Sequence, residues 1–330
     1  MMKNFTFTLA LMIGLSSLVY SQARVQVIHN SADIAAEVVD VWLDDQLLID
    51  DFEFRTATPF IDAPSGVEFR IAIQPANSSS PLNPIWENSY ILEDDATYVL
   101  IANGIVSPSG YTPAVPFNID VYPLGRESAS KAGNSDVLVY HGSTDAPIVD
   151  VVEVLQGAGT IVDDIAYSEF QGYLELPLAD YSLQVRDMSG ANVVAQYAAP
   201  LQTLGLGDQA MVVLASGFLN PNANNKGPGF GLFVALPSGG SLIPLPSEEI
   251  STARVQLIHN ASDEAAKIVD IYLNGELAID NFMFRTATPF VDVPANADVS
   301  VAIQPANSTS AANPLWSNDY VFQGGEKYIL

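Results

Sequence analysis

Apolar and polar residues alternate with a period of two along most of this chain. Runs of this kind cover residues 25–27, 67–73 and 181–185, and they are rich in Val, Ile, Tyr and Phe. Turn signals such as Asn274-Gly275 and Pro64-Ser65-Gly66 separate the runs. Because successive side chains of a strand point to opposite faces of a sheet, this alternation predicts half-buried β-strands.

After the first 21 residues, helical periodicity extends over short segments only. Residues 31–37 and 262–267 are each predicted to form a single helical turn, and no later segment keeps a helical period over three turns. A domain of about a hundred residues with some seven short strands is typically a two-sheet sandwich. We therefore expect an all-β chain of tandem immunoglobulin-like β-sandwich domains.

Internal repetition defines these domains. Residues 24–100 align without a gap with residues 254–330, with 40 identities in 77 positions. A more distant copy lies between them, because residues 137–145 follow the outline of residues 25–33 and are followed by the same Val-Asp motif. Each copy is as long as a whole domain, whereas solenoid repeats span about 20–50 residues. The predicted boundaries are 1–22 for a signal peptide, 23–125 for repeat 1, 126–135 for a linker, 136–246 for repeat 2, 247–253 for a linker and 254–330 for repeat 3.

Repeat 3 is predicted to be truncated. Repeats 1 and 2 continue beyond the strand that corresponds to residues 98–100 and reach a further apolar run, whereas the sequence stops at Leu330, inside that strand. A sheet without its last strand leaves backbone groups unpaired. We therefore expect the 330 residues to be part of a longer protein.

The N-terminus has the layout of a secretory signal peptide. Lys3 precedes an apolar run over residues 5–19, and small and polar residues follow. Cleavage after Ser21 and cleavage after Ala23 both fit, and the alternative is a buried N-terminal helix. No later stretch reaches the roughly 18 apolar residues of a membrane span. We expect a secreted or cell-surface protein with no membrane insertion after cleavage.

The charge balance excludes several classes of partner. The chain has 12 Lys and Arg against 38 Asp and Glu, a net charge of -26. Nucleic acids and anionic membranes both require a cationic face, so neither is expected as a partner. With 48% hydrophobic and 15% charged residues, the chain is not of the disordered class. The absence of cysteine excludes disulfides, thiol nucleophiles and Cys-ligated metal.

The three histidines of the chain share one repeat position. Each is followed by Asp four residues on and by a second Asp in the Val-Asp motif. Imidazole with carboxylates suits a divalent ion, so one interpretation is a metal site in each domain. One His and two Asp make a thin set for zinc, and a structural role, in which the ring bonds a carboxylate or backbone carbonyl, is favoured. The candidates are His29, Asp33 and Asp40 in repeat 1, His141, Asp145 and Asp150 in repeat 2, and His259, Asp263 and Asp270 in repeat 3.

Three further features carry candidate chemistry. Acidic pairs such as Asp50-Asp51 offer oxygen ligands for Ca²⁺, although a solvated acidic surface is the simpler account. Trp86 and Trp316 occupy matching positions and offer a surface for stacking on a sugar, with core packing as the favoured alternative. Arg55 and Arg285 are expected to pair with an internal carboxylate, or with the carboxylate of a ligand.

Catalytic motifs are missing from the sequence. There is no Gly-x-Ser-x-Gly elbow, no His-Glu-x-x-His, no phosphate loop and no Rossmann fingerprint. His141-Gly142-Ser143-Thr144-Asp145 contains His, Ser and Asp, but residues on one strand cannot form a triad. We therefore expect no enzymatic activity and no cofactor, apart from the Ca²⁺ hypothesis.

The repeated pattern resembles the family known as domain of unknown function 4397. The resemblance covers nearly all of the chain after the signal peptide, as two complete copies and one truncated copy. Repeats 1 and 3 depart from the pattern by lacking the Pro at position 147 of repeat 2. The resemblance implies an exported bacterial surface protein, often in tandem domains and here similar to Bacteroidota proteins, and it implies no activity. The closest residues are Val139, His141, Ser143, Asp145, Ala146, Pro147, Val149, Asp150 and Val151.

These observations lead to one functional hypothesis and two alternatives. We expect a non-catalytic surface protein that acts as a spacer, an adhesin or a ligand-presenting module, with an unidentified surface glycan or protein as its partner. The first alternative is a carbohydrate- or calcium-binding module of a larger secreted assembly. The second is a hydrolase whose active residues lie beyond Leu330.

Overall fold

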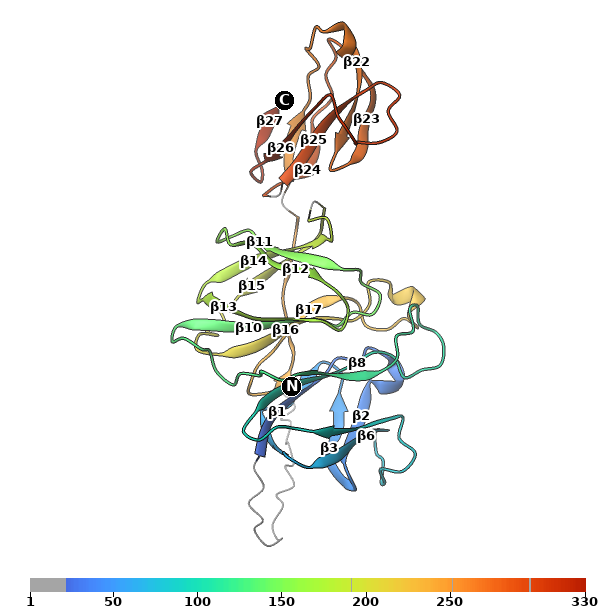
Figure 1. Ribbon diagram of the computed structural model, residues 1–330, viewed down its shortest axis with the longest axis vertical. Helices are drawn as coiled ribbons and strands as arrows, with labels where there is room; N and C mark the ends of the chain where they lie inside the picture. Colours follow the sequence, from blue (N-terminus) through green and yellow to red (C-terminus); the bar gives the residue numbers. More distant parts are fainter. Residues whose placement is uncertain (1–21, 191, 251, 297) are drawn as a thin grey trace, which may run out of the picture. The chain divides into compact units, whose positions relative to one another are not determined.

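The computed structural model describes residues 22–190, 192–250, 252–296 and 298–330. The predicted signal peptide lies outside these residues, except for Gln22. The described chain is all-β, as predicted, and it is built from several separate sheets (Figure 1). The predicted helical turns are present as η1 (Ile34–Ala36) and η3 (Glu264–Ala266), and a third short turn is η2 (Pro221–Ala223). Among the described residues, no helix is long and apolar enough to cross a membrane.

The chain divides into two compact units. Unit 1 comprises Met1–Ala146, Tyr167–Pro177 and Leu206–Pro244, of which residues 22 onward are described. Unit 2 comprises Pro147–Ala166, Leu178–Gly205 and Leu245–Leu330. The residues predicted as repeat 2 are therefore shared between the units. Within unit 1, one sheet of repeat 2 packs on repeat 1, which accounts for the grouping.

Repeat 1 contains two sheets, and its first and last long strands are neighbours. β1 runs parallel to β8, so the chain must leave this sheet, build the other sheet and return. β4 and β5 pair with β1 on its other side. The strands of this sheet are β4 (Thr56–Ala57), β5 (Ile61–Pro64), β1 (Gln22–His29), β8 (Thr97–Asn103) and β9 (Asn118–Tyr122).

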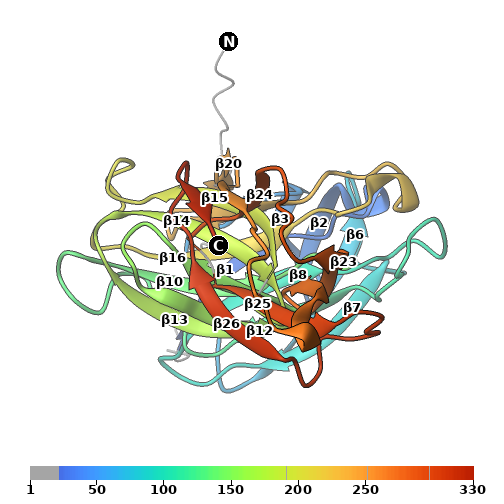
Figure 2. The ribbon, with the colours of Figure 1, turned by 90° about the horizontal axis from the view of Figure 1, so that it is seen from above.

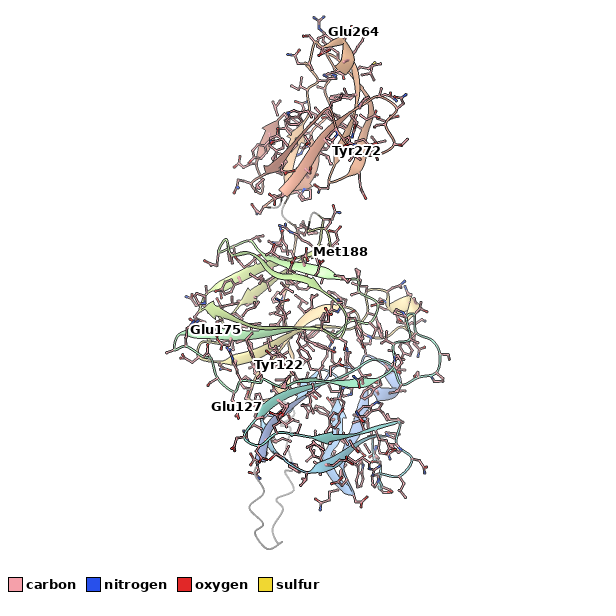
Figure 3. All side chains as sticks on the ribbon, viewed as in Figure 1. Tyr122, Glu127, Glu175, Met188, Glu264 and Tyr272 are labelled. Carbon is pink, nitrogen blue, oxygen red and sulfur yellow. The ribbon has the colours of Figure 1, made fainter. Side chains whose placement is uncertain are left out.

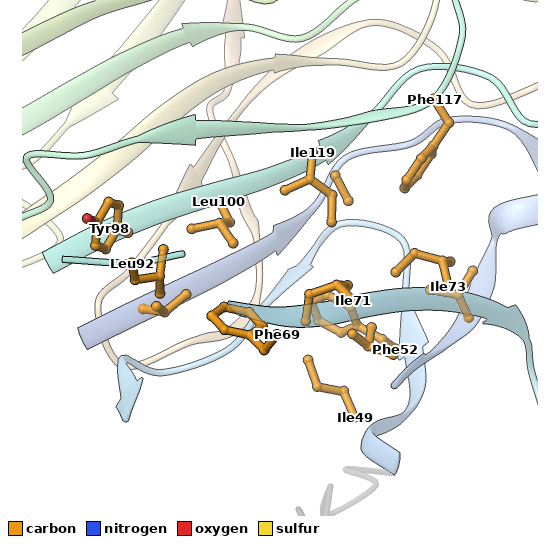
Figure 4. Packing of buried hydrophobic residues seen from close by; sticks show 14 of the residues in the cluster. Ile49, Phe52, Phe69, Ile71, Ile73, Leu92, Tyr98, Leu100, Phe117 and Ile119 are labelled. Carbon is orange, nitrogen blue, oxygen red and sulfur yellow. The ribbon is translucent and has the colours of Figure 1, made fainter. Parts of the chain in front are cut away.

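The second sheet of repeat 1 is antiparallel throughout. Alternating residues of both sheets meet in a core that includes Phe52, Phe69 and Leu100 (Figure 4). This core explains the period-two pattern of the sequence, because each strand turns its apolar side inward. The strands of this sheet, in spatial order, are β3 (Gln46–Glu53), β2 (Val38–Leu43), β6 (Glu68–Pro75) and β7 (Trp86–Ile91).

The same strand orders recur along the chain. The parallel pair β1–β8 has counterparts in β10–β16 and in β21–β27. The sheet of repeat 2 that belongs to unit 1 contains β13 (Phe170–Pro177), β10 (Asn134–His141), β16 (Ala210–Ser216), β17 (Gly231–Ala235) and β19 (Ile243–Pro244). The sheet of repeat 2 in unit 2 contains β12 (Gly159–Ile165), β11 (Val149–Glu153), β14 (Asp180–Asp187), β15 (Val193–Pro200) and β20 (Ser247–Glu248).

Repeat 3 has the same plan within unit 2. β25 and β26 lie side by side as an antiparallel pair, which is visible from two directions (Figures 1 and 2). Its first sheet contains β24 (Val291–Pro294), β21 (Thr252–Gln256) and β27 (Lys327–Ile329). Its second sheet contains β23 (Glu276–Met283), β22 (Ile268–Leu273), β25 (Asp298–Pro305) and β26 (Trp316–Val321).

The joint between repeats 1 and 2 in unit 1 is a second hydrophobic core. The outer side of the β1–β8 sheet contributes Ile28 and Ile101, and the β10–β16 sheet contributes Leu138, Tyr140 and Leu214. Partly buried aromatic residues, including Tyr122 (Figure 3), pack against this cluster. In addition, β18 (Gly240–Ser241), which follows β17, pairs with β4 of repeat 1. Repeat 2 thus supplies an edge strand to a sheet of repeat 1.

Candidate functional site

The histidine of repeat 1 is a buried residue at the end of β1. His29 Nε2 lies 2.7 Å from the carbonyl oxygen of Ala36, and His29 Nδ1 accepts a hydrogen bond from the N–H of Ser31 at 3.4 Å. Because a carbonyl only accepts, Nε2 carries the proton and the ring is neutral. The ring packs against Phe52 and Phe54, at centroid distances of 5.5 and 6.2 Å. Burial lowers the pKa of His29 to about 4, which keeps the imidazole neutral as it fastens β1 to η1.

The other two histidines lie at the same corner of their repeats. His259 Nε2 lies 2.7 Å from the carbonyl oxygen of Ala266. The carbonyl of His141 accepts a hydrogen bond from the N–H of Ser168 at 2.8 Å, and its ring meets the edge of Tyr167 at 6.5 Å. The shared histidine position is thus a shared corner of the fold.

Asp33, the first aspartate of the pattern, ties that corner to a distant loop. Its carboxylate accepts hydrogen bonds from the N–H groups of Ala35, Val106 and Ser107 and from the hydroxyls of Ser107 and Tyr111, at 2.6–3.0 Å. Burial raises the pKa of Asp33, but these hydrogen bonds outweigh it and hold the pKa below its usual value. All of these hydrogen bonds favour the ionised form of the Asp33 carboxylate.

Repeats 2 and 3 each keep one part of this hydrogen-bonding arrangement. Asp145 accepts hydrogen bonds from the N–H groups of Leu219 and Asn220 at 2.8 and 2.9 Å, in the loop that corresponds to 106–107. Asp263 accepts from the N–H of Ala265 at 2.9 Å and so caps η3. A carboxylate at this position is therefore needed to accept hydrogen bonds from the N–H groups of a short helical turn or of a loop.

The second aspartate of repeat 1 controls a bulge. Asp50 and Asp51 on β3 together face the single residue Asp40 on β2, where the strand register shifts. Asp51 has a left-handed φ of 50°, and its N–H donates to Asp40 Oδ1 at 3.0 Å. Asp40 Oδ2 accepts from the N–H and hydroxyl of Ser78, both at 2.6 Å. The buried carboxylate therefore holds the bulge and the loop after β6.

The bulge is present in all three repeats. Asp150 accepts from the N–H of Asp164 at 2.7 Å, and Asp270 accepts from the N–H of Asn281 at 2.9 Å. Asp164 and Asn281 are both left-handed, with φ values of 51° and 53°. Asp and Asn tolerate this conformation better than other residues with a side chain. Burial raises the pKa of Asp270, but hydrogen bonds from Ser308 and Asn281 outweigh it and leave the pKa low.

The structure does not gather His29, Asp33 and Asp40 into one cluster. Within the described residues, one group of three metal-ligating side chains has its ligand atoms within 4.8 Å of one another, and it consists of Asp40, Asp50 and Asp51. This group contains one member of the predicted His–Asp–Asp set and one predicted acidic pair. Its members are a buried carboxylate and two exposed ones.

The two matching tryptophans lie in different surroundings. Trp86 is half-buried and meets the edge of Phe117 at a centroid distance of 5.3 Å, which is the core packing favoured from the sequence. Trp316 is 45% exposed. It lines a cavity of about 450 Å³ in repeat 3, whose apolar wall also includes Phe282 and Leu315.

Arg55 has a role that the sequence did not reveal. Its Nε donates to Ser216 Oγ at 3.0 Å, and its Nη2 donates to the carbonyl oxygens of Ser216 and Gly229 at 3.1 and 2.8 Å. The guanidinium lies over the rings of Phe54 and Phe233, 4.8 and 3.9 Å from their centroids. The predicted pairing of Arg55 with an internal carboxylate is wrong for the described residues. The partners of Arg55 are backbone oxygens, a hydroxyl and two rings of unit 1. Desolvation lowers its pKa to about 10.

Two more polar contacts secure this joint. Asn30 Nδ2 donates to the carbonyl oxygens of Gly142 and Ala215 at 3.1 and 3.3 Å. The hydroxyl of Tyr140 donates to Asp120 Oδ2 at 2.5 Å. Sequence reasoning did not single out Asn30, Tyr140 or Asp120, although the recurrence of Asn30 as Asn260 was a signal. For Arg55 the signal was the unchanged block at 54–60 and 284–290, because core packing alone does not require an arginine there.

Comparison with protein families gives one match. Residues 23–152 match the family described as "Domain of unknown function (DUF4397)". The DUF4397 match covers repeat 1 and the beginning of repeat 2, and over these residues it supports the family resemblance drawn from the sequence. No curated protein matches the chain.

Solved structures resemble the chain only distantly. "The Bacillus anthracis TIE protein" has 10% identity and a TM-score of 0.19, over 94% of this chain and 51% of that one. "Alpha-glucan binding by a streptococcal virulence factor" has 11% identity and a TM-score of 0.20, over 58% of this chain and 92% of that one. The chain thus spans about half the length of the first and nearly all of the second.

Proposed function

We propose that this chain is a non-catalytic, exported cell-surface protein in which immunoglobulin-like DUF4397 domains follow one another in tandem as a spacer. Exposed parts of the domains would serve adhesion or ligand presentation, toward a surface glycan or protein. The observation that carries the proposal is the joint in unit 1. There, a hydrophobic cluster, a shared β-pair and buried hydrogen bonds connect repeat 1 to a sheet of repeat 2.

Such a joint suits a spacer because it resists bending. Interfaces between domains of one chain are usually modest and polar, and their domains then move relative to one another. Here Ile28, Leu138 and Leu214 are fully buried in a cluster that both repeats supply. Bending would expose these side chains to water and leave the Arg55 guanidinium without its acceptors.

The residues shared by all repeats also favour a structural role. In repeat 1, the His29 ring and both carboxylates form hydrogen bonds to backbone or side-chain groups of the same repeat. Asp33 and Asp40 together receive hydrogen bonds from the loops at 106–107 and 78, which lie far away in the sequence. Because the fold needs these hydrogen bonds, the residues that make them are expected to recur in every repeat without a ligand.

The test is a distance measurement across the joint in the full chain. The chain has no cysteine, so Gln46→Cys and Asn222→Cys, at two exposed positions of unit 1, give a unique pair of spin-label sites. We expect a single narrow distance distribution, and a broad one when Arg55→Glu is added. A broad distribution in the parent chain would contradict the spacer. Protease shaving of intact cells tests export, and a chain that stays protected inside the cell would contradict surface display.

The second candidate function is calcium binding, favoured by the acidic group of Asp40, Asp50 and Asp51. Asp40 already accepts hydrogen bonds from Asp51 and Ser78, so two exposed carboxylates remain for an ion. A calcium site predicts a rise in melting temperature with millimolar Ca²⁺ that Asp50→Asn abolishes. An unchanged melting temperature would leave the spacer as the function.

A further inference from the structure

Six of the residues of repeat 1 that contact repeat 2 in unit 1 lie in the segments 26–30 and 55–60, and we call these six the docking face. Val99 and Ile101 of β8 belong to the same hydrophobic cluster. Arg55 and Asn30 donate to oxygen atoms of repeat 2, and Gln26 Nε2 donates to the carbonyl oxygen of Leu236 at 2.7 Å. Three apolar members belong to the cluster that contains Leu138 and Leu214. The docking face consists of Gln26, Ile28, Asn30, Arg55, Ala57 and Phe60.

All six residues of the docking face are identical in repeat 3. The two repeats share 40 of 77 aligned positions, so identity at all six exceeds the general similarity. Val99 of the same cluster corresponds to Ile329, and the position aligned with Ile101 falls after Leu330. The inward neighbour Val27, in contrast, is Leu257 in repeat 3. The corresponding residues are Gln256, Ile258, Asn260, Arg285, Ala287 and Phe290.

The local geometry of the face is also preserved. The N–H of Arg285 donates to the carbonyl of His259 at 2.8 Å, as the N–H of Arg55 does to His29. Both arginines are left-handed, with φ values of 59° and 62°, and both guanidinium groups lie about 5 Å from the ring of the preceding Phe. Repeat 3 therefore holds its face in the geometry that repeat 1 uses for docking, which reduces the ordering cost of binding.

Within the described residues, most of this face of repeat 3 is uncovered. Ile28 is 0% exposed, whereas Ile258 is 46% exposed. Asn260, Arg285 and Ala287 are exposed as well. These residues, whose counterparts in repeat 1 contact repeat 2, are thus uncovered among the described residues, and Arg285 has no carboxylate partner there.

We propose that the docking face of repeat 3 binds a β-sandwich domain that carries the surface chemistry of repeat 2. Such a partner offers two carbonyl oxygens for Asn260, a serine hydroxyl, carbonyls and an aromatic ring for Arg285, and an aliphatic strand surface for Ile258. In this chain the surface of repeat 2 is already covered by repeat 1, whose high effective concentration excludes a competitor. The partner is therefore a separate domain of repeat 2 type without a bound neighbour. This inference does not depend on the spacer function.

The first experiment replaces repeat 1 by the sequence of repeat 3 within the full chain. Residues 254–330 replace residues 24–100, an exchange of equal length without a gap, and repeat 2 of this chain serves as the probe. We expect the chimera to give the same narrow distance distribution between labels at positions 46 and 222 as the parent. Arg55→Glu in the chimera should broaden it. A broad distribution in a chimera with native β-sheet circular dichroism would overturn the proposal.

The second experiment covers a chimera that does not fold. In the full chain, Ile28→Asp with Arg55→Glu releases the surface of repeat 2, so that repeat 3 of the same or another copy can occupy it. We expect dimers by sedimentation at about 100 μM, or a new narrow distance between labels at positions 222 and 276, since a single interface of this kind is expected to bind in the micromolar range. Ile258→Asp with Arg285→Glu should abolish either signal. Neither signal in the released chain, or signals that survive these two substitutions, would overturn the proposal.

Discussion

Arg55 Nε lies 3.0 Å from Ser216 Oγ, although 161 residues separate the two along the chain. One is in repeat 1 and the other is at the end of β16 in repeat 2. This contact joins the two repeats where the hydrophobic cluster of unit 1 ends, and it places a cation among neutral acceptors. The charge is thus solvated by protein dipoles, without a counter-ion among the described residues.

The first prediction concerns this arginine. Arg55→Ala should destabilise unit 1 by about 2 kcal/mol, because the carbonyls of Ser216 and Gly229 lose a charged donor. Trp316→Phe leaves Trp42 and Trp86 as the only tryptophans, so urea unfolding followed by fluorescence then reports on unit 1. Arg285→Ala is the matched control and should change that transition by less than about 0.5 kcal/mol. Equal effects of both substitutions would contradict the assigned role.

The second prediction is a pH dependence from His29. Its folded pKa of about 4 lies below the unfolded value of 6.5, so the unfolded chain binds more protons between these values. Stability is then fully present above pH 6.5 and falls by about 3 kcal/mol as the pH drops toward 4. His29→Gln should remove most of this slope in urea titrations of unit 1. A slope that the substitution leaves unchanged would show that other groups cause it.

The third prediction tests the bulge. Asp40→Ala leaves the N–H groups of Asp51 and Ser78 without their acceptor and should cost about 2–3 kcal/mol. Asp51→Asn is the control, since repeat 3 has Asn281 at this left-handed position, and it should be nearly neutral. Chemical denaturation in the Trp316→Phe background provides both values. A large loss with Asp51→Asn would mean that its carboxylate matters beyond the backbone conformation.

The fourth prediction concerns the close approach of backbones at Gly217. A Cβ there would clash with the Gly229 carbonyl and approach Arg55 Nη2 at 2.7 Å, and φ is +85°. Gly217→Ala should therefore cost at least about 2 kcal/mol. Gly133→Ala in the same unit, with φ of +78° and nothing within 4 Å of the added Cβ, should cost about 1 kcal/mol, and urea unfolding of unit 1 in the Trp316→Phe background measures both losses. Similar losses would leave backbone strain alone as the cause.

The sequence predicted local structure well because local structure follows from local pattern. Alternation over 67–73 became β6, and the helical turn expected within 31–37 is η1. The predicted linkers are only partly irregular. β10 begins at Asn134, inside the first linker, and β20, which lies inside the second linker, pairs with β15. Pairing of short polar segments depends on an available sheet edge, which the sequence does not display.

The site was predictable in its residues but not in its connections. The His–Asp–Asp pattern was visible, and the same Asp or Asn at positions 51, 164 and 281 hinted at a shared backbone conformation. The acceptors of Arg55 were not predictable, because two are carbonyls that any residue type supplies. Only the packing of two distant sheets brings them together.

The pairing of β18 with β4 has a consequence for biosynthesis. Gly240 and Ser241 complete the edge of a sheet whose other strands all end by Tyr122. During synthesis from the N-terminus, one edge of this sheet stays unpaired until repeat 2 has almost fully emerged. A chaperone that shields the β4 edge during this interval would determine how much of the chain reaches its native form.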